Sequence, residues 1–419
     1  MPAPLLPFYV GGEWRGASSD RPFANILNPY DNSPVGRVAL ADERDLQTAI
    51  ERALAGFQKT KSLQSYERHQ ILSFVAEKIR EQKEEFASLI VSEVGKPLSA
   101  ARGEIERSIT TFQYAAEESR RIGGDVVPLD ISVAGKNRYG ILRRFPLGVI
   151  LGISPFNFPL NLVAHKVAPA IASGNAFLLK PATQASLTSL RLARIIEASG
   201  FPIEAFSVLP CSNALAGELV KDERIKMFSF TGSPVVGWSL KSTAGKKKVV
   251  LELGGNAGVI VDRTANIDVA VRKNLMGAFV YSGQVCIKVQ RIYIHAEIFE
   301  EYKARFLEAA QALKSGDPQN PETVVGPVIN SDAVDRIMNW IEEARDLGAT
   351  VLIGGGHTGR VIEPTVLINV PREAKVFCTE VFGPVVTLHK FESIEEAVRG
   401  VNDSQYGLQA GLFSNDYRN

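Results

Sequence analysis

The chain has 419 residues, of which 45% are hydrophobic and 22% are charged, and this length is typical of a protein with more than one domain. Its 47 lysine and arginine residues nearly balance its 46 aspartate and glutamate residues, so the charge provides no general attraction for nucleic acid or for an anionic membrane. We therefore expect partners that are small molecules or copies of the same chain.

The cysteines, histidines and apolar runs exclude several classes of protein. Cys211, Cys286 and Cys378 are widely spaced and form no CxxC pair, which indicates a reducing compartment without a disulfide framework. The five histidines lack metal-ligand spacing, so no metal is expected. Residues 1–7 lack the features of a signal peptide, and prolines interrupt the longest apolar tract, residues 147–163. We expect a cytoplasmic protein that does not span a membrane.

The first part of the chain is predicted to be helical. Apolar residues recur at helical spacing from Ser65 to Val94, and Gly95 followed by a lysine and a proline gives a stop signal. A charged segment, 101–121, is also predicted to form a helix. Residues 125–146 have the pattern of two strands joined by a polar loop.

From Gly148 onward the pattern alternates between strands and helices. Short apolar runs, each followed by a helix-like stretch, occur at 149–151, 176–179, 206–209 and 227–230. Such runs predict a parallel sheet with crossover helices, and ligands bind at the carboxyl ends of strands in such sheets. Asn157, Lys180 and Gly232 all follow predicted strand ends, where a cofactor is expected.

A second α/β pattern begins after Leu253 and contains Cys286, a predicted strand at 291–294 and helices starting near Glu297 and Ser331. We therefore predict an α/β protein with two domains. Residues 1–252 form a Rossmann-like parallel-sheet domain that binds the cofactor, and residues 253–419 form a catalytic domain that carries a nucleophilic cysteine. The active site is expected between the two domains.

Glu252 and Cys286 are candidates for a base and a nucleophile, because both lie on glycine-flanked turns. A cysteine thiolate can attack a carbonyl, and backbone amides between Gln284 and a helix-like segment can favour the thiolate. A partly desolvated carboxylate suits a general base. Taken alone, the two residues could equally be an inert thiol and a surface carboxylate at a strand end.

Further motifs occur in order around this pair, and together they resemble the aldehyde dehydrogenase superfamily. They are Pro155-Phe156-Asn157-Phe158-Pro159, Lys180-Pro181-Ala182, Phe230-Thr231-Gly232-Ser233, Glu252-Leu253-Gly254-Gly255-Asn256, Gly283-Gln284-Val285-Cys286 and Glu380-Val381-Phe382-Gly383-Pro384. The resemblance extends from about Tyr9 to the last residue. Residues 159–166 are similar to the branch that handles small polar aldehydes, such as lactaldehyde or phosphorylated and acidic semialdehydes.

The resemblance implies oxidation of an aldehyde to the carboxylic acid with NAD or NADP. Cys286 would attack the aldehyde, Asn157 and the Cys286 amide would stabilise the oxyanion, and Glu252 would activate a water to hydrolyse the thioester. Lys166 would support a proton path from Glu252. Relatives that transfer the acyl group to coenzyme A generally lack a glutamate at the position of Glu252, so its presence favours hydrolysis.

The resemblance also implies the cofactor contacts. Lys180 would bond the adenosine ribose, Gly232 and Ser233 would open a helix toward the pyrophosphate, and Glu380 would hold the nicotinamide ribose. No GxGxxG fingerprint is present. Thr183 stands where strict NAD users often place a glutamate, which leaves NAD and NADP both open. The expected cofactor-binding residues are Ser154, Phe156, Lys180, Thr231, Gly232, Ser233, Gly237, Leu253, Glu380 and Phe382.

Four residues are candidates for substrate contacts. His165 and Asn161 would line a polar substrate passage, although each could equally be a packed helix residue. Lys288 departs from the small residue usual two positions after the cysteine, and it either favours an anionic aldehyde or points to solvent. Arg107 is a second candidate cation.

Residues 125–146 match the strands that project and pair between subunits in the family, so we expect a homodimer or homotetramer; an ordinary surface hairpin is the alternative. Family members usually continue for several dozen residues beyond Asp416. We therefore expect the 419-residue form to be a shortened or poorly assembling one. The rival function is a catalytically silent cofactor-binding or structural homologue.

Overall fold

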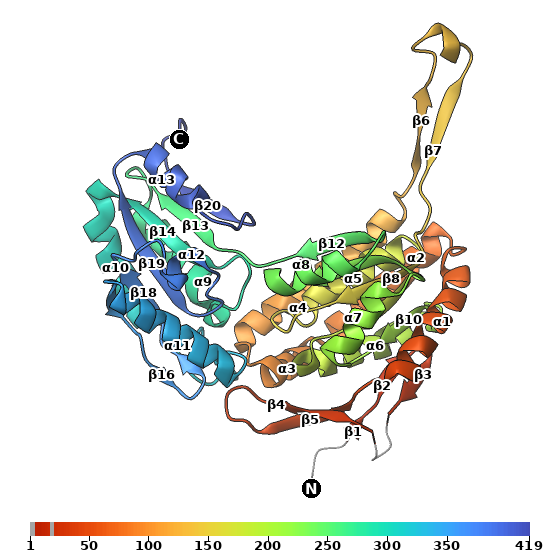
Figure 1. Cartoon of the computed structure of the whole chain (residues 1–419), viewed down its shortest axis with the longest axis horizontal. Helices are drawn as coiled ribbons and strands as arrows, with labels where there is room; N and C mark the ends of the chain where they lie inside the picture. Colours follow the sequence, from red (N-terminus) through yellow and green to blue (C-terminus); the bar gives the residue numbers. More distant parts are fainter. Residues whose placement is uncertain (1–4, 17–20) are drawn as a thin grey trace. The chain divides into compact units, whose positions relative to one another are not determined.

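The computed structural model describes residues 5–16 and 21–419, which divide into two compact units (Figure 1). Unit 1 contains Pro34–Leu89 and Gly103–Glu252 together with the described residues before Leu27. Unit 2 contains Leu253–Asn419 and two earlier segments, Leu27–Ser33 and Ile90–Arg102, which the sequence placed in the first domain. The assignment of one function to each domain stays a prediction.

Unit 1 is built around a seven-stranded sheet in the order β12-β11-β8-β9-β10-β2-β3. The strands are β2 (Phe8–Val10), β3 (Glu13–Arg15), β8 (Val149–Ile153), β9 (Ala176–Lys180), β10 (Phe206–Val208), β11 (Ile225–Thr231) and β12 (Lys248–Glu252). Neighbouring strands from β12 to β10 are parallel, whereas β2 runs antiparallel to β10 and β3 antiparallel to β2. The predicted parallel sheet with crossover helices is therefore confirmed.

The strand order of this sheet reverses between β8 and β11. From β8 the chain proceeds outward through β9 to β10, and it then returns to place β11 and β12 on the opposite side of β8. In open parallel sheets, ligands bind outside the carboxyl ends of the strands at such a reversal. The carboxyl ends of β8 and β11 are therefore the expected cofactor edge of unit 1.

Helices precede and connect these strands. Their bounds are α1 (Glu43–Thr60), α2 (Ser65–Glu81), α3 (Lys83–Val94), α4 (Leu98–Ser119), α5 (Asn161–Ala172), α6 (Ser186–Glu197), α7 (Asn213–Lys221) and α8 (Pro234–Thr243). The helix predicted from Ser65 to Val94 is divided into α2 and α3 at Gln82, whose backbone leaves the helical region. Short 3₁₀ turns also occur, as η1 (Val133–Gly135), η2 (Thr183–Ala185), η3 (Ile203–Ala205), η4 (Val280–Gly283) and η5 (Ala296–Ile298).

Two smaller sheets involve residues before β8. One is three-stranded, in the order β1-β5-β4, with β1 (Leu5–Leu6), β4 (Phe23–Leu27) and β5 (Pro34–Ala39). The other is the antiparallel pair β6 (Gly124–Pro128) and β7 (Tyr139–Arg143), which extends away from the other elements of unit 1 in Figure 1. Large apolar side chains are exposed along this hairpin, among them Val126, Ile131, Val133, Tyr139, Ile141 and Phe145.

Unit 2 contains a six-stranded sheet in the order β15-β18-β19-β14-β13-β20. Its strands are β13 (Ala257–Val261), β14 (Val289–His295), β15 (Thr350–Ile353), β18 (Thr365–Ile368), β19 (Val385–Phe391) and β20 (Ala410–Phe413). All neighbours are parallel except β15, which is antiparallel to β18. The short strands β16 (His357–Thr358) and β17 (Val361–Ile362) form a separate antiparallel pair.

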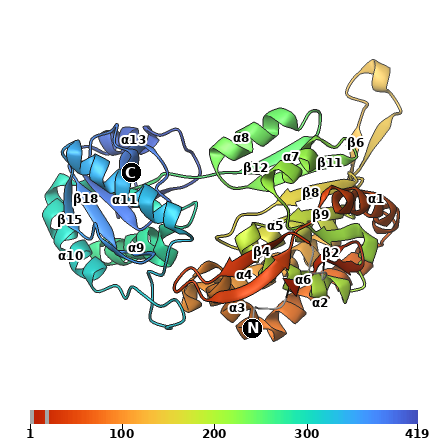
Figure 2. The ribbon, with the colours of Figure 1, turned by 60° about the horizontal axis from the view of Figure 1, so that its bottom comes forward.

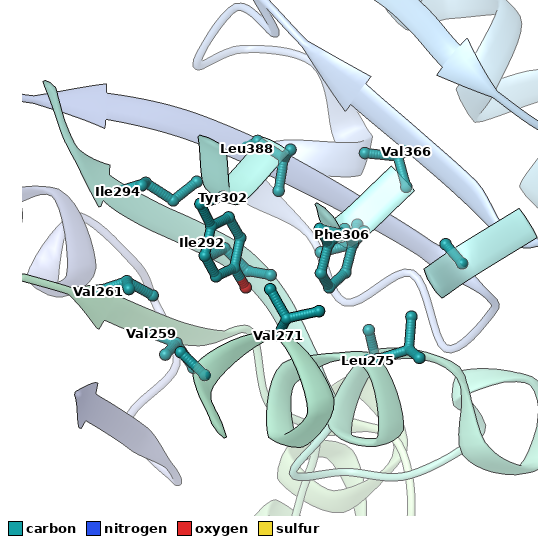
Figure 3. Close-up of a cluster of buried hydrophobic side chains, with 14 of the residues drawn as sticks. Val259, Val261, Val271, Leu275, Ile292, Ile294, Tyr302, Phe306, Val366 and Leu388 are labelled. Carbon is teal, nitrogen blue, oxygen red and sulfur yellow. The ribbon is translucent and has the colours of Figure 1, made fainter. Parts of the chain in front are cut away.

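Helices cover both faces of this sheet, as Figure 2 shows. They are α9 (Ile267–Phe279), α10 (Phe299–Gln311), α11 (Ser331–Asp346), α12 (Lys375–Cys378) and α13 (Ile394–Asn402). Because strand side chains alternate between faces, Val259 and Val261 join the cluster formed with α9 and α10, whereas Ile260 joins the cluster formed with α13. Figure 3 shows the first cluster, with Tyr302 and Phe306 of α10 against the sheet.

Among the described residues, no helix is long and apolar enough to cross a membrane.

Candidate active site

The carboxyl edge of the unit 1 sheet holds several of the predicted cofactor residues. Ser154 follows β8 and is buried, and its N–H donates to the Lys180 carbonyl at the end of β9 at 3.1 Å. Thr231 ends β11, and the N–H of Gly232 donates to the carbonyl of Glu252 at 3.0 Å. These contacts gather the ends of β8, β9, β11 and β12 at the reversal of strand order.

Helix α8 begins at this edge. Ser233 is the N-cap residue, Pro234 occupies the first turn, and the N–H of Gly237 donates to the Ser233 carbonyl at 3.0 Å. A Cβ at Gly232 would lie 2.6 Å from the ring of Phe230, so any larger residue there would have to displace that ring. The first-turn amides of a helix attract anions, and this start of α8 therefore fits a pyrophosphate group.

Lys180 is buried at the end of β9, and its ammonium donates to Asn213 Oδ1 at 3.3 Å. Burial lowers the pKa of Lys180, an effect that nearby Cys211 opposes. Burial also raises the pKa of Cys211 to about 11, which disfavours the reactive thiolate form of this residue.

Lys166 on α5 is buried against the same sheet. Its ammonium donates to Ser229 Oγ at 3.0 Å and to Thr231 Oγ1 at 2.7 Å. Burial lowers the pKa of Lys166 to about 8, although the charge of Glu252 acts in the opposite direction. The Glu252 side chain itself is exposed at the end of β12, whereas the sequence led us to expect a partly desolvated carboxylate.

The loop after β8 places Asn157 in a buried position and leads into α5. Glu104 on α4 accepts hydrogen bonds from the backbone N–H groups of Leu160 at 2.9 Å and Asn161 at 3.0 Å. A carboxylate at this position satisfies two N–H groups at the start of α5 and complements the helix dipole. Sequence reasoning missed Glu104, because a glutamate on a charged helix gives no signal of burial.

The three substrate candidates of unit 1 lie close together. The Arg107 guanidinium lies 5.6 Å from the centre of the Phe158 ring, and Thr111 Oγ1 donates to Asn161 Oδ1 at 3.3 Å. The His165 side chain is exposed. Its pKa is nevertheless lowered, first by partial desolvation and then by the positive charges of Arg107 and Lys166. Arg107, Asn161 and His165 thus form one polar group on α4 and α5.

In unit 2 the chain before Cys286 adopts an uncommon backbone. Tyr281, Ser282 and Gly283 have φ angles of 53°, 55° and 67°, which cost energy for residues other than glycine and cluster at functional sites. Buried side chains hold this conformation: Tyr281 donates to the Val94 carbonyl at 3.1 Å and Ser282 to the Gly326 carbonyl at 2.6 Å.

Cys286 is half-buried immediately after this segment. A turn closed by a hydrogen bond from Lys288 N–H to the Val285 carbonyl at 3.0 Å leads from it into β14. We expected a helix-like segment after Gln284, and this was wrong. Helix α9 ends before Cys286, and the chain after Gln284 turns directly into β14. The amides near Cys286 therefore belong to a turn.

The Glu380 turn lies against the start of unit 2. Glu380 Oε1 accepts from Gly255 N–H at 3.1 Å, and a Cβ at Gly254 or Gly255 would clash with the Glu380 carboxylate or the Cys286 carbonyl, respectively. Burial raises the pKa of Glu380, while the Gly255 N–H and two cations oppose that shift. Because Gly254 and Gly255 have no side chains, the backbone after Leu253 can lie directly against Cys286 and Glu380.

Lys288 is buried, so the alternative that it points to solvent is wrong. Its ammonium donates to the carbonyl of Val385, directly after the Glu380 motif. Burial lowers the pKa of Lys288 to about 7, and the charge of Glu380 partly offsets this. The long side chain thus reaches the Glu380 turn within its own unit, which a sequence position alone does not reveal.

Each unit therefore groups part of the predicted site. Unit 1 gathers Ser154, Lys166, Lys180, Thr231, Gly232, Ser233 and Glu252 at one sheet edge, with Phe156 and Asn157 in the adjoining loop. Unit 2 gathers Leu253, Cys286, Glu380 and Phe382. The glycine-lined start of α8 and the buried Lys180 fit a dinucleotide. Among the described residues, no group of histidine, cysteine, aspartate or glutamate side chains could hold a metal ion.

Comparison with known proteins gives consistent matches. The sequence pattern of the Aldehyde dehydrogenase family matches residues 14–419. A 3-sulfolactaldehyde dehydrogenase from Priestia aryabhattai is 40% identical over 409 residues, which are 97% of this chain and 85% of the relative.

Solved structures match over nearly the whole chain. Aldehyde dehydrogenase 21 from Physcomitrella patens, in complex with the reaction product succinate, has a TM-score of 0.97 and 42% identity, covering 100% of this chain and 87% of that one. A glyceraldehyde-3-phosphate dehydrogenase from Methanocaldococcus jannaschii, complexed with NADP, has a TM-score of 0.91 and 35% identity, covering 95% and 87%.

Proposed function

The chain belongs to the aldehyde dehydrogenase family, and we propose that it oxidises a small polar or anionic aldehyde to the carboxylic acid with NAD or NADP. The observation that carries the proposal is the family match over residues 14–419. We assign the catalytic roles to Cys286, Glu252 and Asn157, because their motifs resemble those of the family. The alternative of a silent homologue lacks support, because the relatives that match almost the whole chain are enzymes.

In the proposed first half-reaction, the Cys286 thiolate adds to the aldehyde carbon. The Asn157 side-chain amide and the Cys286 backbone N–H donate hydrogen bonds to the oxyanion that forms. NAD or NADP, when bound, would supply the acceptor for the hydride that leaves this carbon, and Lys180, Gly232, Ser233 and Glu380 would hold it. The acyl group then remains on Cys286 as a thioester.

In the second half-reaction, Glu252 takes a proton from a water molecule, and the resulting hydroxide attacks the thioester. The carbon–sulfur bond breaks, which releases the carboxylic acid and restores the Cys286 thiolate. Lys166 supports this step, since a buried lysine with a pKa of about 8 can take up and release a proton near neutral pH.

An anionic substrate is favoured by the relatives and by the polar group on α4 and α5. The names of three relatives refer to compounds that carry an anionic group: 3-sulfolactaldehyde, the product succinate and glyceraldehyde 3-phosphate. Arg107 provides a cation whose charge acts on His165, and Asn161 lies one turn before His165 on α5. Because Lys288 is committed to the Val385 carbonyl, we assign anion binding to Arg107 instead.

The activity is tested by following reduced-cofactor absorbance with NAD and with NADP against a panel of aldehydes. The panel includes lactaldehyde, succinic semialdehyde, glyceraldehyde 3-phosphate and a sulfonated aldehyde, and Cys286→Ala is the control. We expect turnover in the wild type and none in the control. Absence of turnover with every aldehyde and both cofactors would refute the proposed function.

Substrate charge is tested by the ratio of kcat/KM for succinic semialdehyde to that for butanal. A charge-assisted contact contributes about 1.5–3 kcal/mol, so Arg107→Gln should lower this ratio by roughly one to two decades. Lys288→Ser should leave the ratio unchanged. Equal ratios in wild type and Arg107→Gln would remove Arg107 from substrate selection.

We further propose that β6 and β7 pair between subunits of a homodimer or homotetramer. Their exposed apolar side chains support this, since Val126 on β6 and Ile141 on β7 are 72% and 63% exposed in the single chain. None of the three cysteines, all of which lie within the described residues, forms a disulfide, and this fits our proposal of a cytoplasmic location.

A further inference from the structure

Gln290 on β14 is almost fully buried and uses both ends of its side-chain amide. Its Nε2 donates to the Thr379 carbonyl at 2.7 Å and to the Val376 carbonyl at 3.0 Å. Its Oε1 accepts from the Val381 N–H at 2.9 Å. One side chain, four residues after Cys286, therefore binds the backbone on both sides of Glu380.

The backbone that Gln290 holds leads into a strained residue. Phe382, two residues after Glu380, has a φ angle of 49°, which is a rare conformation for a bulky residue and persists only where the surroundings fix it. Arg336 contributes from α11 by donating to the Val381 carbonyl at 2.8 Å. The Glu380 N–H donates to the Tyr406 hydroxyl at 3.3 Å.

Lys288 holds the far end of the same turn. Lys288 lies directly before β14, and Gln290 lies within β14 where its register with β13 shifts. Lys288 binds the Val385 carbonyl, and Gln290 binds the segment from Val376 to Val381. Lys288 and Gln290, which follow Cys286, thus bind the Glu380 turn on both sides of the carboxylate-bearing residue.

We propose that Gln290 is a positioning residue for the cofactor: it fixes the Glu380 turn so that the carboxylate can accept hydrogen bonds from the nicotinamide-ribose hydroxyls. This inference rests on the proposed function of Glu380. Gln290 does not contact the reacting atoms and acts through Glu380. A misplacement of about 1 Å at a positioned group can cost on the order of a hundredfold in rate.

The test compares Gln290→Met, which keeps the length of the side chain and removes its hydrogen bonds, with the wild type. We expect the dissociation constant of the cofactor, measured by protein-fluorescence titration, to rise about tenfold or more, and kcat to fall. The rate of Cys286 alkylation by iodoacetamide in the absence of cofactor should stay within about twofold. The KM for the aldehyde should change little.

A matched control separates positioning from general stability. Asn274 donates to the Tyr302 hydroxyl at 2.9 Å in the core of the same unit, away from the Glu380 turn. Asn274→Leu should lower Tm and leave the cofactor dissociation constant unchanged. If Gln290→Met behaves like Asn274→Leu, with loss of Tm alone, Gln290 is structural and the proposal is overturned.

A double-mutant cycle tests the route through Glu380. In a Glu380→Gln background, Gln290→Met should weaken cofactor binding by far less than it does in the wild type, because the group it positions is gone. Equal weakening in both backgrounds overturns the proposal. Should Gln290→Met fail to fold, Gln290→Asn replaces it, since the shorter amide cannot reach both Thr379 and Val381.

The outcomes distinguish this inference from the proposed function. A wild type that binds neither NAD nor NADP overturns both. A wild type that binds cofactor and oxidises aldehydes, with Gln290→Met unchanged in cofactor binding, overturns only the role of Gln290.

Discussion

The Lys166 ammonium donates a hydrogen bond of 2.7 Å to the hydroxyl of Thr231, where β11 ends at the cofactor edge of unit 1. Its other partner is also a neutral hydroxyl, Ser229 Oγ at 3.0 Å. A buried cation that is served by neutral groups gives up its proton more easily than one in water, and burial accordingly lowers the pKa of Lys166 to about 8. Lys166 can therefore change charge in the pH range in which the proposed hydrolysis operates.

We predict that this charge change appears in the pH dependence of turnover. If neutral Lys166 helps to remove the proton from Glu252, kcat should rise as pH increases through about 8. Lys166→Met should lose this limb and lower kcat by at least about tenfold, less than the hundredfold or more typical of a group that transfers the proton directly. The measurement is kcat from about pH 6 to about pH 10 at saturating substrates. An unchanged profile in Lys166→Met would remove the residue from the proton path.

Lys288 should make stability depend on pH. Its folded-state pKa is about 7, whereas an unfolded lysine titrates near 10.4. Between these values the unfolded chain binds the extra proton, so the free energy of unfolding rises with pH. Relative to Lys288→Met, the wild type should gain stability between about pH 7 and about pH 10. Urea denaturation of both proteins at the two ends of this range gives the difference, and a constant difference would contradict the prediction.

Glu104 should stabilise α5. Glu104→Ala leaves the N–H groups of Leu160 and Asn161 without their carboxylate acceptor, and a buried unsatisfied group costs about 1–3 kcal/mol. We therefore expect a loss of about 2 kcal/mol or more in the free energy of unfolding. Glu104→Gln, which keeps an acceptor oxygen, should recover a large part of it. Equal losses in the two variants would show that the capping contact contributes little.

The hairpin should control assembly. Ile141 on β7 is 63% exposed, and a charge at an intersubunit strand disrupts pairing. Ile141→Asp should shift the mass measured by light scattering toward the monomer. Tyr114→Asp is the control, because Tyr114 is 69% exposed on α4, outside the hairpin. An unchanged mass in Ile141→Asp, or an equal shift in both variants, would contradict the pairing role.

The sequence predicted the residues of the motifs better than the residues that hold those motifs in place. Cys286 and Glu380 were recognisable because each lies in a glycine-containing motif, and the alternation of strands and helices indicated both sheets. Gln290 was missed because its partners are backbone groups about ninety positions away in the chain. A polar residue inside the apolar strand that follows Cys286 was the available signal.

Long-range packing explains the remaining differences. Residues 90–102 belong to unit 2, and the hydrogen bond from Tyr281 to the Val94 carbonyl is one of the contacts that join them to it. No local pattern encodes such a contact. Lys288 was expected at the substrate or in solvent, and only the structure shows that its flexible side chain reaches Val385. Exposure of Glu252 likewise depends on packing rather than on its motif.

The most direct test of covalent catalysis by Cys286 is rapid mixing of Glu252→Gln with cofactor and a substrate aldehyde, followed by intact-mass analysis. We predict a single burst of reduced cofactor, no more than one per active site, and an acyl adduct on the peptide that contains Cys286. Cys286→Ala should give neither signal while still binding cofactor. Sustained near-normal turnover in Glu252→Gln, or reduced cofactor formed by Cys286→Ala, would contradict the account.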